Sequence, residues 1–138
     1  MYKTILALAL LLAAPAAYAQ DAPIRGTLRG NIYQDDQPTP YPVTITVNGT
    51  TGTTHYTGAT ECRGQLTGLR YANGTLYGNM YNETIVQNAH NPPRNNGGCY
   101  NGGMLSLTLA PNGQLSFRWS LEWETDFVRA GGELDPVR

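Results

Sequence analysis

The chain carries little charge of either sign and has no long apolar run after its first residues. Of its 138 residues only 14% are Asp, Glu, Lys or Arg, with nine basic against ten acidic. A nucleic-acid-binding domain needs a basic face, and a protein held to a membrane surface by charge needs a polybasic segment. No apolar stretch is long enough to cross a bilayer. We therefore expect neither a nucleic-acid partner nor membrane insertion.

The first residues have the features of an export signal. Lys3 precedes an apolar run at 5–14, and a small-x-small cleavage site follows at 17–19. Removal of residues 1–19 leaves a single domain, 20–138. Because Lys3 is the only charged residue of the signal, eight basic and ten acidic residues remain, a net charge of −2. We expect a monomer in the periplasm or outside the cell.

Cysteine is scarce, with only Cys62 and Cys99. Two cysteines in an exported chain are expected to pair, because the compartment is oxidising. The alternative, a reactive thiol pair, lacks the C-x-x-C spacing. The two positions lie 37 residues apart, and closing a loop of that length stabilises the fold by about 4 kcal/mol in the chain-entropy model.

Short alternating segments separated by turn residues recur along the rest of the chain. The clearest is 41–47, where apolar and polar residues alternate with a period of two, as is typical of a half-buried strand. No sustained helical period is present, and glycine is abundant. The sequence therefore predicts an all-β domain. The expected strands are 26–33, 41–47, 53–60, 65–71, 75–86, 103–109, 114–123 and 127–134.

The turn residues indicate how these strands are connected. Asn-Gly pairs, a strong signal for tight hairpins, follow the second, fourth and sixth expected strands. They are Asn48-Gly49, Asn73-Gly74 and Asn112-Gly113. In an up-and-down meander these turns lie at one end, and the longer connections 34–40, 61–64, 87–101 and 124–126 lie at the other. We expect an eight-stranded antiparallel barrel, small and lipocalin-like, whose interior is filled or holds one small ligand. A β-sandwich is the alternative.

Several short segments, spread over nearly the whole domain, carry a resemblance. They are Gly26-Thr27-Leu28-x-Gly30, Tyr41-Pro42-Val43-Thr44-Ile45, Cys62-x-Gly64-x-Leu66, Asn82-Glu83-Thr84-Ile85, Cys99-x-Asn101-Gly102-Gly103, Leu115-Ser116-Phe117-Arg118-Trp119 and Ala130-Gly131-Gly132-Glu133-Leu134. In these segments the chain is similar to a small bacterial exported module, free-standing or the outer C-terminal domain of some actinobacterial serine/threonine kinases. Arg63 departs from the small residue usual there, and the 87–101 loop is longer. The resemblance implies an exported sensing or binding module.

Five residues are candidates for binding at the long-loop end: Glu83, Arg63, Arg94, Tyr100 and Trp123. Glu83 shares a strand face with Tyr81 and Ile85, so an inward face would bury its carboxylate and raise its pKa. Arg63 and Arg70 are possible partners. The structural alternatives for Glu83 are a buried ion pair and a solvated strand end.

No arrangement of residues in the sequence predicts catalysis or a bound metal. His55 is expected at the short-turn end and His90 on the long loop, too far apart for one metal site, and no catalytic motif is present. We therefore expect no cofactor and a non-enzymatic exported module that binds a protein or a small ligand. The alternatives are a small hydrolase using carboxylates and a structural envelope protein.

Overall fold

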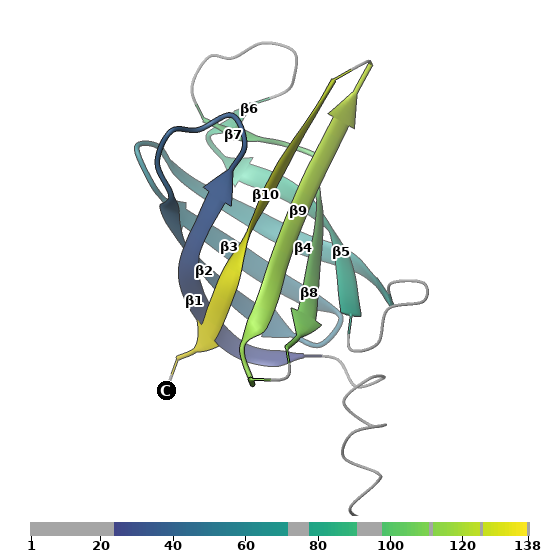
Figure 1. The fold of residues 1–138 in the computed structure, drawn as a ribbon. Helices are drawn as coiled ribbons and strands as arrows, with labels where there is room; N and C mark the ends of the chain where they lie inside the picture. The colour runs from purple at the N-terminus through teal and green to yellow at the C-terminus, as the bar shows by residue number, and fades with distance from the viewer. Residues whose placement is uncertain (1–23, 72–77, 91–97, 111, 125, 138) are drawn as a thin grey trace, which may run out of the picture.

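The chain folds into a closed antiparallel β-barrel (Figure 1). The computed structural model describes residues 24–71, 78–90, 98–110, 112–124 and 126–137. The strands are β1 (Arg25–Gln34), β2 (Tyr41–Asn48), β3 (Thr51–Thr57), β4 (Glu61–Tyr71), β5 (Gly78–Gln87), β6 (Ala89–His90), β7 (Cys99–Tyr100), β8 (Met104–Leu109), β9 (Leu115–Trp123) and β10 (Asp126–Pro136). Over these ranges no helix has the length and apolar character needed to span a membrane.

The barrel closes by pairing its first strand with its last. The order around the barrel is β1-β10-β9-β8-β5-β4-β3-β2, and Leu28 of β1 lies opposite Pro136 of β10. Closure leaves no free sheet edge. The predicted eight-stranded up-and-down barrel is confirmed, and the β-sandwich alternative is not found. The two remaining strands, β6 and β7, form a separate parallel pair.

The core consists of the inward side chains of the barrel strands. Strand alternation places every second residue inside, and the buried apolar residues come from all eight barrel strands: Leu28, Ile32, Val43, Ile45, Val47, Tyr56, Cys62, Leu66, Tyr81, Ile85, Leu105, Leu107, Leu115, Phe117, Trp119, Val128, Ala130 and Leu134. Phe117 and Trp119 of β9 both belong to this core. Leu121 and Trp123, near the end of β9, are only half-buried.

The two ends of the barrel differ, as predicted. Asn48 pairs with Thr51 across a two-residue turn, in which Gly49 has φ +71°. The β8–β9 turn contains Gly113 with φ +87°. Both turns lie at one end, and β6 and β7 lie at the other (Figure 1). We call the second the long-loop end. The third predicted turn, Asn73-Gly74, lies outside the described residues, as does the signal 1–19.

Two placements from the sequence are wrong. The expected connection 61–64 belongs to β4, which pairs with β3 from Glu61 onward. Its inward residues Cys62, Gly64 and Leu66 continue one alternation from the expected connection into the expected strand. His55 is the other error: it lies opposite Arg63, late in β3 and toward the long-loop end, because β3 begins at Thr51.

Candidate functional site

A cavity of about 340 Å³ lies inside the barrel at the long-loop end. This volume is at the lower end of the range for small-ligand sites. Its rim comes from the β1–β2 and β3–β4 connections and from the segment next to β7, and its walls are inward side chains of the barrel. The barrel interior is therefore filled by side chains at the short-turn end and open at the other.

Glu83 of β5 supplies the carboxyl group of this cavity. Its side chain is 2% exposed, and its Oε2 accepts hydrogen bonds from Thr54 Oγ1 at 2.7 Å and from the Tyr56 hydroxyl at 2.5 Å. Both donors belong to β3, on the far side of β4. Gly64 of β4 makes this reach possible, because a Cβ at position 64 would overlap the Thr54 hydroxyl and approach Glu83 Oε2 to 3.2 Å.

Burial controls the protonation of this carboxyl group. Removal from water raises the pKa of Glu83, and the donors Tyr56, Thr54 and Trp119 offset only part of that increase. Burial and the nearby carboxylate also raise the pKa of the Tyr56 hydroxyl, which therefore remains a donor. No basic side chain takes part in these interactions.

The predicted arginine partners of Glu83 are wrong. Arg63 is exposed, because its neighbours Cys62 and Gly64 occupy the inward positions of β4. Arg70 is exposed as well, and its Nη1 donates to the carbonyl of Gly68 at 3.1 Å and to Asn82 Oδ1 at 3.3 Å. Glu83 is therefore neither a buried ion pair nor a solvated strand end.

Trp119 brings an unused donor next to this carboxyl group. Its Nε1 is buried and has no hydrogen-bond partner among the described residues. The indole N–H lies near enough to Glu83 to favour the ionised carboxylate, but it makes no hydrogen bond to it. Gly103 provides space for the indole, because a Cβ there would overlap Nε1. The Gly103 carbonyl also accepts a hydrogen bond from the Glu83 N–H at 2.8 Å, which joins β5 to the residue just before β8.

Aromatic rings form much of the wall and the mouth of the cavity. Tyr41 and Tyr56 meet edge to face with ring centroids 6.0 Å apart. Tyr100 stacks on Trp123 at 5.6 Å and on Trp119 at 6.4 Å. Tyr100 therefore lies at the mouth with its ring packed on both tryptophans.

A segment between β5 and β8 carries Tyr100 to this position. We call its described part, 88–90 and 98–101, the strap. Its two halves pair through the Cys99 N–H and the Asn88 carbonyl at 2.9 Å and through the Asn101 N–H and the His90 carbonyl at 2.8 Å. The strap thus forms a small parallel ladder at the mouth of the barrel.

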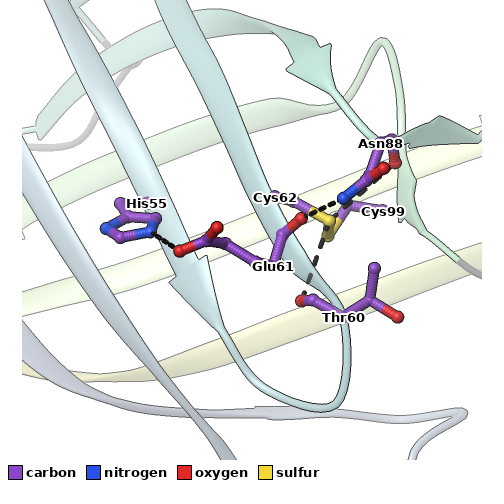
Figure 2. A network of polar contacts seen from close by, with 6 residues as sticks. All are labelled: His55, Thr60, Glu61, Cys62, Asn88 and Cys99. Carbon is purple, nitrogen blue, oxygen red and sulfur yellow. Dashed lines mark hydrogen bonds and ion pairs between the residues drawn. A yellow bond between two sulfur atoms is a disulfide. The ribbon is translucent and has the colours of Figure 1, made fainter.

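The predicted disulfide attaches the strap to the barrel wall. Cys62 of β4 is bonded to Cys99, with Cα atoms 6.1 Å apart. Figure 2 shows a second attachment beside it, from Asn88 Nδ2 to the carbonyl of Glu61 at 2.5 Å. On the outer face the Glu61 carboxylate meets His55 Nε2 at 2.8 Å, and this contact lowers the pKa of Glu61.

The structure brings together two of the five predicted site residues. Glu83 and Tyr100 line the cavity, whereas Trp123 supports Tyr100 and Arg63 faces outward. Arg94 lies outside the described residues. The two histidines do not meet, and in the described ranges no group of three or more His, Cys, Asp or Glu is placed to hold a metal ion.

The residues missed from the sequence are mostly partners of Glu83. Thr54 and Tyr56 are two positions apart in β3, so they share its inward face, and Tyr41 is in phase with the buried residues of β2. This alternation could have identified all three as inward-facing residues from the sequence. The contact across β4 was not predictable, because it depends on the register of three strands.

Comparisons of the chain with family models, with curated proteins and with solved structures found no match. The case for a function therefore depends on the geometry of the cavity, and the resemblance to an exported bacterial module stays a prediction.

Proposed function

We propose that this protein is an exported, non-enzymatic barrel that binds a small ligand in the cavity beside Glu83. The observation that carries the proposal is a carboxyl group that has no basic partner among the described residues and lies among the aromatic rings that line a 340 Å³ cavity. A few converging polar groups within an otherwise apolar pocket are typical of ligand sites. The disulfide is compatible with an oxidising compartment outside the cytosol.

The cost of this arrangement supports a binding role. Protein interiors are close-packed, and burying a carboxyl group without an opposite charge is unfavourable. A barrel with a purely structural role gains nothing from leaving such a group beside empty space. The cavity wall is mainly aromatic and aliphatic, and the mouth is partly covered by Tyr100, which suits a small molecule better than a protein surface.

The number of carboxylates argues against the hydrolase alternative. Hydrolysis of a glycosidic bond by this chemistry uses two carboxyl groups facing the same bond. Within the described part of the chain, Glu83 is the single acidic residue that lines the cavity. The geometry therefore supports retention of a ligand rather than its cleavage.

Titration with N-phenyl-1-naphthylamine, a neutral probe that fluoresces in apolar surroundings, tests the proposal. We expect saturable binding by the mature protein. Ala130 lines the cavity beside Trp119, its partner on the neighbouring strand β9. Ala130→Leu should therefore fill part of the cavity and weaken binding by about tenfold or more. Ala89→Leu makes the same change at an exposed position outside the cavity lining and should leave binding unchanged. Absence of binding, or equal binding by both variants, would contradict the proposal.

A further inference from the structure

We propose that the ligand is a small organic cation whose ammonium group binds Glu83 and whose apolar body lies among the aromatic rings of the cavity. This inference rests on the proposed function and specifies the class of ligand. Three features of the site support it: its lone carboxyl group, its rings and the acidic groups around its mouth.

Within the described ranges, the cavity lining holds one carboxyl group and no basic side chain. Among the residues that the structure describes, Glu83 is the one Asp, Glu, Lys or Arg in the lining. The described arginines all have exposed side chains: Arg25, Arg29, Arg63, Arg70, Arg118 and Arg129. His90 packs on Tyr100 with ring centroids 5.1 Å apart but does not line the cavity. An anionic ligand would meet a carboxylate with no compensating cation, whereas an ammonium group supplies the missing opposite charge.

The carboxyl group also has one oxygen left to accept a further donor. Thr54 and Tyr56 both donate to Oε2, and Oε1 takes part in neither hydrogen bond. An ammonium group has three donors and no acceptor. It therefore matches a carboxylate that is already fixed in position by two neutral donors.

The walls suit a cation as well. Tyr41, Tyr56 and Trp119 line the cavity around the carboxyl group, with Phe117 and Tyr100 beside them. The face of an aromatic ring attracts an ammonium group, most strongly where water is excluded. The same rings bury the apolar part of the ligand. An alkali metal ion would leave most of this 340 Å³ cavity unfilled.

The mouth is acidic. Asp35, Asp36 and Asp126 lie close enough to Tyr100 to raise the pKa of its hydroxyl. Grouped negative charges raise the local concentration of cations and speed their association. The entrance and the interior thus favour the same sign of charge.

Three probes of nearly equal shape test the inference by calorimetry: 2-phenylethylamine, 2-phenylethanol and phenylacetate. At neutral pH we expect the amine to bind about tenfold or more tighter than the alcohol, because a hydrogen bond between charged groups contributes a free energy of that size. Phenylacetate should bind weakest. The amine should displace N-phenyl-1-naphthylamine. Glu83→Gln should remove the preference for the amine, whereas Glu133→Gln, the same change at an exposed position of β10, should retain it.

The outcomes separate this inference from the proposed function. If N-phenyl-1-naphthylamine binds but the amine and the alcohol bind equally well, the proposal of a cationic ligand is wrong and the proposed binding function stands. The same holds if Glu83→Gln keeps the preference for the amine. Tighter binding of phenylacetate than of the amine would likewise exclude a cationic ligand and leave the proposed binding function in place. If none of the probes binds, both proposals fail.

Discussion

The Tyr100 hydroxyl donates a hydrogen bond to Asp36 Oδ2 at 2.9 Å, and this contact joins residues 64 positions apart across the mouth of the barrel. Asp36 also accepts from Gln34 Nε2 at 2.6 Å, and Gln34 Oε1 accepts from the Tyr41 hydroxyl at 2.5 Å. The result is a continuous bridge from β2 to the strap. Burial and the acidic neighbours, Asp36 above all, raise the pKa of Tyr100 to about 12, so the hydroxyl remains a donor at neutral pH.

Removing this hydroxyl should open the mouth without emptying the cavity. Tyr100→Phe keeps the ring stacked on Trp123 but loses the hydrogen bond to Asp36. We expect a loss of about 1 kcal/mol in the free energy of unfolding. We also expect N-phenyl-1-naphthylamine to dissociate several times faster, because the strap is less firmly held. Stopped-flow fluorescence measures the dissociation rate, and urea unfolding measures the stability.

Tyr33→Phe is a matched control, since Tyr33 is 66% exposed on the barrel surface and should change neither quantity. Unchanged dissociation from Tyr100→Phe would show that the bridge does not gate the mouth. Tyr100→Ala is less informative, because it also removes ring contacts with Trp119 and Trp123.

The raised pKa of Glu83 predicts how stability depends on pH. Below the ordinary value of 4.5, both the folded and the unfolded chain carry the proton, so burial of the group adds no pH-dependent cost. As pH rises above that value, the unfolded chain releases its proton while the folded chain retains it. Stability is therefore lost up to the raised pKa of the folded state, by at most about 1.4 kcal/mol per pH unit, and stays level above it.

Glu83→Gln isolates this effect, because the amide is neutral at every pH and its oxygen still accepts from Thr54 and Tyr56. Tyr41 and Tyr56 are the other ionisable side chains facing Glu83, and both have pKa values raised by burial and by Glu83, so they stay protonated across this window. We expect the stability of the variant relative to wild type to increase from pH 4 upward in urea unfolding. A constant difference across the series would mean that the carboxyl group is not buried.

The disulfide should form when the protein is produced in an oxidising compartment, and it should stabilise the fold. Thiol titration of the denatured, unreduced protein should give about zero thiols per chain. Because the bond closes a 37-residue loop, we expect the free energy of unfolding of the double variant Cys62→Ala/Cys99→Ala to be about 4 kcal/mol lower than that of the wild type. Two titratable thiols per chain would show that the bond does not form.

Much of the barrel could be predicted because its strands obey local rules. Segment 41–47 alternates strictly, and Val43, Ile45 and Val47 are all buried in β2. The glycine of Asn48-Gly49 has the positive φ that a tight hairpin requires. These features depend on neighbours in the sequence, so they can be recognised without knowing the register.

The site was less predictable because it depends on contacts across strands. That Glu83 faces inward follows from its phase with Tyr81 and Ile85. Its partners do not follow, because Thr54 reaches it over Gly64, and only the paired strands show that this position must lack a side chain. The sequence suggested an ion pair between Glu83 and Arg63 of the expected connection 61–64, but the register of β4 turns Arg63 outward.

Two glycine substitutions test whether binding is confined to one end of the barrel. Gly113 lies in the β8–β9 turn with φ +87°, and a Cβ there would meet nothing within 4 Å. Gly113→Ala should therefore cost about 1 kcal/mol through backbone strain alone and leave ligand binding unchanged. Gly103 has space only because it lacks a side chain beside the Trp119 indole, so Gly103→Ala should force the indole to move.

We expect Gly103→Ala to lower stability by about 1–3 kcal/mol, to change the tryptophan emission, and to weaken binding of N-phenyl-1-naphthylamine and 2-phenylethylamine together. Both variants are to be titrated at temperatures where they remain folded by circular dichroism, so that lost binding is not lost structure. The difference follows from position, because both changes add one methyl group and only one of them displaces a wall of the cavity. A binding loss in Gly113→Ala equal to that in Gly103→Ala would refute the assignment of the site to the long-loop end.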